Sequence, residues 1–250
     1  MAPPQRQRVV LVHGFTQTGA SWDHIAGALR DDGCDVVTPT LPGHGGIPAA
    51  DLTATAAQLV AATEHESATW VGYSMGGRAC LHVALSRPSA VERLVLLGAT
   101  AGIDDPAERN ARRHRDELLA TRIEAIGVER FVEEWLAQPM FEHVPSDAGG
   151  GAEARTRDNT AAGLAGALRL AGTGAQEPLW DRLHEIGVLG IPTLVLAGEL
   201  DGKFKVLAKR LADAIGPTAR TEWVPGAGHA AHLEHPDAFV TIVRRFLDRT

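Results

Sequence analysis

Residues 69–78 read Thr-Trp-Val-Gly-Tyr-Ser-Met-Gly-Gly-Arg, and they are the most informative segment of the chain about its architecture. Its first half, Thr69 to Tyr73, is an apolar run with β-branched residues, which predicts a buried strand. Residues 76–86 have the pattern of a helix. Between strand and helix lies Gly72-Tyr73-Ser74-Met75-Gly76, a G-x-S-x-G motif whose glycines let neighbouring backbone approach without a Cβ clash. We therefore expect Ser74 on a strained turn, with its hydroxyl above the carboxyl edge of a sheet.

The same alternation of strand and helix recurs along much of the chain. Apolar runs indicate strands at residues 8–12, 36–37, 91–97, 194–197 and 221–224. Helical patterns indicate helices at residues 21–30, 52–63, 206–214 and 237–248. Continuous apolar strands separated by helices are typical of a parallel sheet covered on both faces. The sequence therefore predicts the α/β class.

A long helical segment interrupts this alternation after the fourth predicted strand. Residues 104–185 are nearly all helical in pattern and rich in arginine and glutamate. We interpret this segment as an insertion into the sheet domain. The predicted organisation is a first core part at residues 1–101, a helical cap at residues 102–186 and a second core part at residues 187–250.

Length and charge exclude several classes of protein. The 250 residues suit one α/β domain with an insertion. A formal net charge of −7 argues against a general nucleic-acid binder. No stretch approaches the roughly 18 apolar residues of a membrane-spanning helix, and the start of the chain lacks the apolar core of a secretory signal. What remains is a cytoplasmic, soluble enzyme or binding domain.

Two residues late in the chain are candidate partners of Ser74. A catalytic serine needs an imidazole, and the imidazole needs a carboxylate that fixes its tautomer. Asp201 follows the strand at residues 194–197, and His229 follows the strand that ends at Val224, so both lie on loops at the same sheet edge as Ser74. Glu199 is the competing acid, but it lies nearer to the strand. We expect Ser74, Asp201 and His229 to form a catalytic triad.

The loop after the first strand, His13-Gly14-Phe15, is expected to complete the site. In this architecture that loop supplies one N–H of an oxyanion hole, here that of Phe15, and the N–H of Met75 supplies the other. We interpret His13 as a hydrogen-bonded structural histidine beneath the site. His44, in the turn after the second strand, is expected to order that turn.

Two other interpretations of the loop that contains His229 are disfavoured. Residues 226–231 match the G-x-G-x-x-A of dinucleotide sites, but the residues after them leave no room for a βαβ unit. His229, His232 and His235 recur every three residues without a carboxylate or cysteine partner, so we expect no metal site. His232 and His235 are interpreted as packing or helix-start residues. We expect no organic cofactor either.

Arginines indicate what kind of molecule the pocket handles. Only three of the 24 basic residues are lysines, and the planar guanidinium of arginine holds carboxylates through two hydrogen bonds. Arg78 follows Ser74 by four residues, about one helical turn, so its side chain can point into the same pocket. Arg109, Arg112 and Arg113 share one face of a predicted helix, although arginines in charged helices are more often solvated. A cation beside the serine favours an anionic substrate.

With these motifs in place, the chain resembles the α/β-hydrolase fold along its whole length: a mostly parallel sheet flanked by helices, with a helical cap inserted after the fourth strand. Motif by motif it resembles a narrower family, the menaquinone-pathway 2-succinyl-6-hydroxy-2,4-cyclohexadiene-1-carboxylate synthases. The segments that support this resemblance are HGFT (residues 13–16), LPGHG (41–45), GYSMGGR (72–78), the arginine-rich residues 109–115, WLAQPMF (135–141), GTG (172–174), GELDGKF (198–204) and GH (228–229). The arginine after the serine motif and the W-x-x-Q-P-x-F string are the most discriminating. About eight residues precede the first strand, so we expect the two antiparallel strands that often open this fold to be missing.

The resemblance implies a lyase that removes pyruvate from 2-succinyl-5-enolpyruvyl-6-hydroxy-3-cyclohexene-1-carboxylate, a substrate with several carboxylates. It implies that Arg112 binds a substrate carboxylate, as Arg78 could. A third arginine should lie at Arg155 or Arg157; the register of the motif does not decide between them, and we favour Arg157.

The resemblance also places Trp135 and Phe141 against the substrate, with core packing as the alternative for at least one of them. Tyr73, beside Ser74, fits either a role in the pocket or packing of the turn. Two other classes of function remain open. The same triad could hydrolyse an ester, a thioester or a carbon–carbon bond of a small anionic substrate. A non-catalytic receptor is disfavoured by the intact triad.

Overall fold

The computed structural model describes residues 7–64 and 66–248 and contains a six-stranded sheet in the order β2-β1-β3-β4-β5-β6. The strands span Arg8–Val12 (β1), Asp35–Val37 (β2), Ala68–Tyr73 (β3), Val91–Leu97 (β4), Thr193–Gly198 (β5) and Ala219–Val224 (β6). Every neighbouring pair of these strands is parallel. The predicted α/β class is confirmed.

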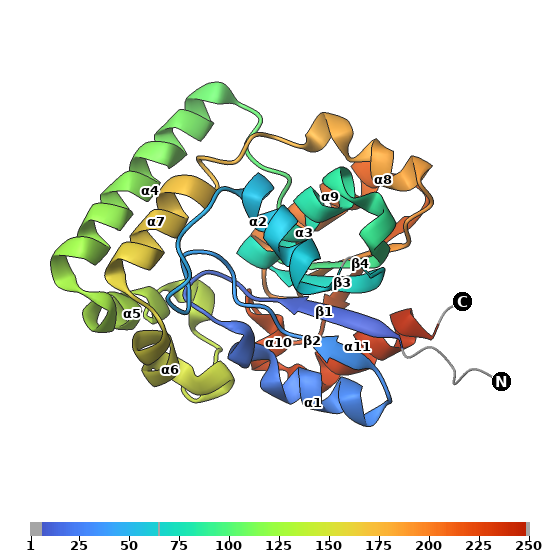
Figure 1. The fold of residues 1–250 in the computed structure, drawn as a ribbon, viewed down its shortest axis with the longest axis horizontal. Helices are drawn as coiled ribbons and strands as arrows, with labels where there is room; N and C mark the ends of the chain where they lie inside the picture. Colours follow the sequence, from blue (N-terminus) through green and yellow to red (C-terminus); the bar gives the residue numbers. More distant parts are fainter. Residues whose placement is uncertain (1–6, 65, 249–250) are drawn as a thin grey trace.

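Helices cover both faces of the sheet, as the apolar runs predict (Figure 1). The helices of the main body are α1 (Asp23–Asp31), α2 (Leu52–Ala62), α3 (Met75–Ser86), α8 (His184–Val188), α9 (Gly202–Ile215), α10 (Ala231–Glu234) and α11 (Pro236–Leu247). Alternate strand residues point to opposite faces. Val10 and Val12 pack with α2, α3 and α9, whereas Val9 and Leu11 pack with α1 and α11. Both faces are therefore buried at the centre of the sheet, which explains why every residue of β3 and β5 is buried and nearly all of them are apolar.

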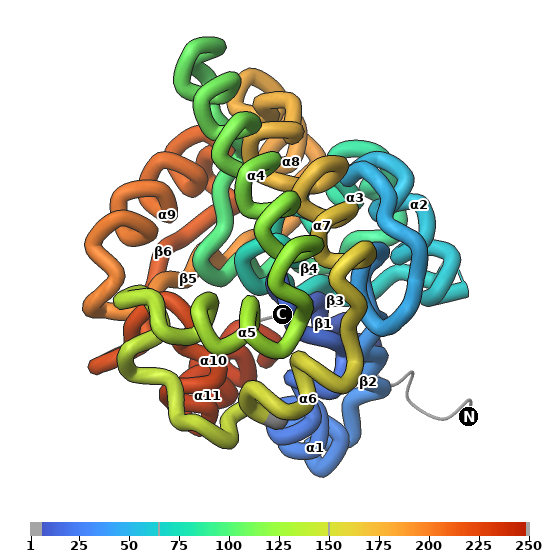
Figure 2. The backbone as a smooth tube through the Cα atoms, turned by 90° about the vertical axis from the view of Figure 1, so that its left-hand side faces the viewer, coloured from blue at the N-terminus to red at the C-terminus, as the bar shows by residue number. Residues whose placement is uncertain are grey.

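Four of the helices between β4 and β5 cover one edge of the sheet (Figures 1 and 2). They are α4 (Pro106–Ile126), α5 (Val128–Leu136), α6 (Gly151–Asp158) and α7 (Ala161–Ala171). Ile123 of α4, Phe131 of α5 and Leu164 of α7 belong to a small core of their own. We call residues 106–171 the cap.

The end of the predicted insertion returns to the main body. Leu179, Leu183 and Ile186 are buried in the same core as α3 and α9. Leu179 and Leu183 flank a short 3₁₀-helix at Trp180–Arg182, and Ile186 lies in α8. Residues 179–186 therefore pack with the main body, although the prediction groups them with the cap.

The parallel arrangement brings four loops to the sheet edge beneath the cap. These loops follow β1, β3, β5 and β6, because the carboxyl ends of parallel strands share one edge. They contain Phe15, Ser74, Asp201 and His229. Within the described residues, 7–64 and 66–248, no helix is long and apolar enough to cross a membrane.

Candidate active site

Ser74 lies on a strained turn between β3 and α3. Its φ is 51°, a positive value that residues other than glycine rarely adopt. Its N–H donates to the carbonyl of Leu97 at 2.8 Å, which ties the turn to β4. A Cβ on Gly72 would lie 2.6 Å from the nitrogen of Gly77, and one on Gly76 would lie 2.2 Å from the carbonyl oxygen of Val12. Only glycine fits at these two positions, as the motif predicts.

Asp201 and His229 meet at this sheet edge. The Nδ1 of His229 lies 2.8 Å from Oδ2 of Asp201, and Oδ1 of Asp201 accepts the N–H of Phe204 at 3.1 Å, which caps α9. Burial pushes the pKa of Asp201 upward, but the hydrogen bonds from His229 and Phe204 and the nearby charge of Lys203 together hold this pKa below its usual value. Asp201 is thus an ionised carboxylate that accepts two hydrogen bonds and fixes the ring of His229.

Two glutamates hold the loop that presents His229. Glu199, the competing acid of the sequence, accepts the N–H of Gly226 at 2.9 Å. Glu234 accepts the N–H groups of Gly228 and Ala230. Glu199 therefore shapes the histidine loop, whereas Asp201 bonds the imidazole.

A cavity of about 460 Å³ lies between this edge and the cap, and both Ser74 and His229 line it. Among the described residues, the side chain of Ser74 makes no hydrogen bond to His229. Such catalytic bonds often form fully only in the substrate complex. The cavity therefore brings hydroxyl and imidazole to one space, in which a substrate can complete their contact.

Phe15 and Met75 line the same cavity, each beside Ser74. In the loop of Phe15, the N–H of Gly14 donates to Gln17 and that of Thr16 donates to His44. Neither the N–H of Phe15 nor that of Met75 donates to another described residue. Both backbone groups are thus available to a substrate oxygen, in keeping with the predicted oxyanion hole.

His13 and His44 are structural residues beneath this loop, as the sequence predicts. Nε2 of His13 accepts the N–H of Leu41 at 2.9 Å, and Nε2 of His44 accepts the N–H of Thr16 at 3.2 Å. Burial lowers the pKa of His44 to about 4 and that of His13 well below its usual value. Both rings are therefore neutral acceptors near pH 7.

Arg78 and Arg112 supply positive charge to the cavity. Arg78 is buried on α3, and its Nη1 donates to the carbonyl of Ala171 at 2.7 Å and to Oε1 of Gln176 at 3.2 Å. Burial, with repulsion from Arg112, lowers the pKa of Arg78 to about 10, so this guanidinium is still charged near neutral pH. Arg112 reaches the cavity from α4 of the cap. One cation from the main body and one from the cap thus line the same space.

The preference for Arg157 over Arg155 is wrong. Arg157 is exposed and forms an ion pair with its neighbour Asp158 at 2.8 Å. Arg155 is buried and donates from Nη1 to Oγ1 of Thr16, in the loop of Phe15. Residues two apart on a helix point in nearly opposite directions, about 200° around its axis. On α6, Arg155 is the residue that faces inward.

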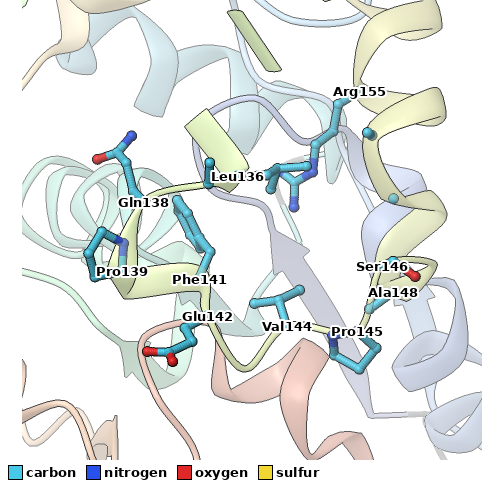
Figure 3. A pocket seen from close by; sticks show the side chains of 13 residues that line it. Leu136, Gln138, Pro139, Phe141, Glu142, Val144, Pro145, Ser146, Ala148 and Arg155 are labelled. Carbon is cyan, nitrogen blue, oxygen red and sulfur yellow. The ribbon is translucent and has the colours of Figure 1, made fainter. Parts of the chain in front are cut away.

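Arg155 lines a second cavity of about 530 Å³ beneath α5 and α6 (Figure 3). The side chain reaches from α6 into this space, with Phe141 on the opposite side. Gln138 and Phe141 line both cavities, so they separate the space of Arg155 from that of Ser74. Burial lowers the pKa of Arg155 to about 10. Among the described residues no carboxylate pairs with this guanidinium.

Aromatic side chains form the remaining wall of the reaction cavity. Trp135 and Phe141 both line it, with ring centroids 5.7 Å apart. Tyr73 has a dual position: it borders the cavity, but its ring is buried and packs 4.3 Å from His232 and 5.4 Å from His229. Both expectations for Tyr73, a pocket role and packing, are therefore compatible with its place.

Several lining residues were not singled out from the sequence. They are Arg115, Asp116, Leu119, Gln138, Met140, Lys203 and Phe204. Arg115 and Asp116 follow Arg112 on one helix, and Asp116 lies four residues from it, a spacing that predicts contact. Phe204 packs on the ring of His229 at 4.4 Å. In the sequence, its position three residues after Asp201 was the one feature that indicated a place near the site.

The last loop holds the histidines that were considered for a metal site, and it lies within the described residues 7–64 and 66–248. No group of three histidine, cysteine, aspartate or glutamate residues there could hold a metal ion. His232 is buried between Trp22 and Tyr73, and His235 precedes α11. Both are therefore packing or helix-start residues, as predicted.

Comparison with known proteins adds a family to this geometry. Residues 9–242 match the model of the alpha/beta hydrolase family. A Bacillus subtilis (strain 168) protein provisionally named 2-succinyl-6-hydroxy-2,4-cyclohexadiene-1-carboxylate synthase is 33% identical over 98% of this chain and 92% of its own length. The Serratia proteamaculans (strain 568) protein of that name is 30% identical over 97% of this chain and 93% of its own. The structure of MenH from S. aureus superposes with a TM-score of 0.88 at 31% identity, covering 98% of this chain and 95% of that one.

Proposed function

The chain belongs to the alpha/beta hydrolase family and, within it, to the 2-succinyl-6-hydroxy-2,4-cyclohexadiene-1-carboxylate synthases, and from that membership we propose that it is the lyase that forms this product. Its substrate is 2-succinyl-5-enolpyruvyl-6-hydroxy-3-cyclohexene-1-carboxylate, and its second product is pyruvate. The reaction belongs to menaquinone biosynthesis.

One observation supports this proposal above the others: Ser74, His229, Arg78 and Arg112 line a single cavity. A serine and a histidine alone fit any hydrolase of this fold. Two guanidiniums in the same space fit a substrate with several carboxylates, because arginine binds a carboxylate through two parallel hydrogen bonds. These contacts would orient the ring so that one carbon–hydrogen bond faces Ser74.

The proposed chemistry begins with a proton transfer. His229, aligned by Asp201, takes the proton of the Ser74 hydroxyl while Oγ removes the proton from the ring carbon that bears the succinyl group. The electrons of that carbon–hydrogen bond move onto the succinyl carbonyl and form an enolate. The N–H groups of Phe15 and Met75 stabilise its oxygen; losing one such donor typically costs about 2.7–4 kcal/mol of transition-state stabilisation.

The enolate then collapses and expels the enolpyruvyl group of the substrate. A new ring double bond forms at the succinyl-bearing carbon, the existing double bond shifts by one position, and the ring carbon–oxygen bond to the enolpyruvyl group breaks. Pyruvate leaves as its enolate and takes the proton back from His229. No proton is consumed overall, and Ser74 never becomes acylated.

The test is pyruvate release by the purified protein from the enolpyruvyl substrate, followed continuously with lactate dehydrogenase. The proposal predicts one pyruvate for each substrate consumed, and none with the Ser74→Ala variant. Ordinary hydrolysis is the alternative. Rapid cleavage of p-nitrophenyl esters without pyruvate release would support that alternative and overturn the lyase.

A further inference from the structure

Asp116 is a buried carboxylate in a cavity that otherwise presents cations. It lies on α4, is only 4% exposed and lines the space shared by Ser74, Arg78 and Arg112. A carboxylate in such a place repels an anionic substrate and loses its own hydration. A buried carboxylate in this place is therefore expected to be held by specific hydrogen bonds.

Both oxygens of Asp116 are engaged, each by a different group. Oδ1 accepts the Nε–H of Arg112 at 2.7 Å, and Oδ2 accepts the N–H of Gly174 at 3.0 Å. The turn that contains Gly174 also packs tightly on α4: a Cβ on Gly174 would lie 2.3 Å from the nitrogen of Arg113, and one on Gly172 would lie 2.7 Å from Oδ2 of Asp116. Asp116 thus joins α4 to the turn after α7.

The bond to Nε determines which edge of Arg112 is left for a ligand. A guanidinium can hold a carboxylate through Nε and one Nη, or through its two Nη atoms. Because Asp116 occupies Nε, the outer edge with both Nη atoms is the one available to the cavity. Arg112 is 36% exposed along its side chain, so without this bond its guanidinium would have room to rotate into solvent.

We propose that Asp116 is a positioning residue that holds Arg112 so that both Nη atoms face a substrate carboxylate. This inference rests on the proposed function, because it deepens the account of how a polycarboxylate is bound. The negative charge of Asp116 also offsets the repulsion between the Arg112 and Arg78 guanidiniums, which lie in the same cavity.

The Asp116→Asn variant tests the inference because two effects oppose each other. The amide has one oxygen, so either Arg112 or Gly174 then faces an N–H group instead of an acceptor. The same change removes a negative charge and, by electrostatics alone, would tighten binding of an anion. Positioning predicts that kcat/KM for pyruvate release falls about 10- to 100-fold. Unchanged or higher kcat/KM would overturn the inference.

Glu117→Gln is the matched control. Glu117 is the next residue of α4, and it bonds Arg169 of α7 on the outer surface, at 2.8 to 3.1 Å. Its loss also weakens an α4–α7 connection but leaves the cavity intact. We expect kcat/KM to stay within about 2-fold of wild type, because Glu117 does not line the reaction cavity and surface substitutions of this kind usually change stability by no more than about 0.5 kcal/mol.

A double-mutant cycle separates positioning from a merely structural role. If Asp116 acts through Arg112, the Asp116→Asn change has little further effect on kcat/KM in an Arg112→Ala background. If the two losses multiply, Asp116 acts independently of Arg112, and the inference is wrong.

Calorimetric binding of tricarballylate, a simple tricarboxylate, distinguishes this inference from the proposed function. Positioning predicts that the Kd for this probe rises in Asp116→Asn and not in Glu117→Gln. If the wild type releases no pyruvate but shows this pattern, the lyase assignment fails and the role of Asp116 stands. If the wild type releases pyruvate and the Kd is the same in Asp116→Asn as in wild type, the lyase assignment stands and the role of Asp116 fails.

Discussion

The Nδ1 of His229 lies 2.8 Å from Oδ2 of Asp201, and the other oxygen of the same carboxylate caps helix α9. The acid of the site is therefore fixed by the secondary structure that follows it. A helix cap that also orients an imidazole leaves the carboxylate little freedom to rotate. The orientation of His229 towards the reaction cavity follows from this double attachment.

Asp201→Asn tests that relationship. Asparagine can still cap α9, but it favours the wrong tautomer of His229, so we expect kcat for pyruvate release to fall about 10⁴-fold. Glu199→Gln is the control, because Glu199 bonds the backbone of Gly226 and not the imidazole. An Asp201→Asn enzyme as active as the Glu199→Gln enzyme would show that the carboxylate has no catalytic role.

Arg78→Met removes a buried cation from the reaction cavity. Charge-assisted hydrogen bonds contribute about 1.5–3 kcal/mol, so kcat/KM for the polycarboxylate should fall by about 10- to 150-fold. Arg87→Met is the matched control, because Arg87 follows the same helix, is exposed, and its guanidinium donates to the carbonyl of Ser86. Equal effects of the two substitutions on steady-state kinetics would contradict a role for Arg78 in binding.

Arg155 and Arg157 form a natural pair of inward and outward arginines on α6. Because Arg155 is buried without a carboxylate partner among the described residues, Arg155→Met should leave the melting temperature unchanged or raise it. The same variant should have a higher KM for the polycarboxylate, because the bond from Arg155 to Thr16 fixes the loop of Phe15, which lines the reaction cavity. Arg157→Met should change neither. A melting temperature that drops for Arg155→Met with unchanged KM would show that Arg155 serves packing alone.

Buried histidines should make the protein sensitive to acid. Burial lowers the pKa of His44 to about 4 and that of His13 and His232 well below the usual value. In the unfolded chain these rings take up protons below about pH 6.5. The unfolded state then binds more protons than the folded state, so stability is complete above about pH 6.5 and is lost towards pH 4, by about 1.4 kcal/mol per pH unit for each ring.

His232→Phe measures one of these contributions. His232 lies between the rings of Trp22 and Tyr73, and neither of its nitrogens has a hydrogen-bond partner among the described residues. Phenylalanine should fill this apolar place without titrating. Urea unfolding at about pH 7 and about pH 5 should give a smaller loss of stability for the variant than for wild type. The same loss in both proteins would mean that His232 is not held neutral.

Local patterns in the sequence predicted much of the fold and the chemistry at the sheet edge. G-x-S-x-G placed Ser74 on its turn because the glycines are a steric requirement, and the post-strand positions of Asp201 and His229 follow from parallel strands sharing one edge. The cap was harder to predict. Whether Arg155 or Arg157 faces inward depends on the rotation of α6 against the loop of Thr16, a contact across 139 residues of sequence. The role of Asp116 likewise depends on a turn 58 residues away.

The origin of the oxygen in the released pyruvate distinguishes elimination from hydrolysis. The reaction is run in water enriched in the heavy oxygen isotope, with lactate dehydrogenase present to reduce pyruvate before its carbonyl exchanges, and the lactate is analysed by mass spectrometry. Elimination breaks the bond between the ring and the ether oxygen, so the account predicts a lactate hydroxyl without heavy oxygen, and no lactate with Ser74→Ala. Lactate that carries the heavy isotope in its hydroxyl would show that water attacks the enol ether, and the enzyme would be a hydrolase.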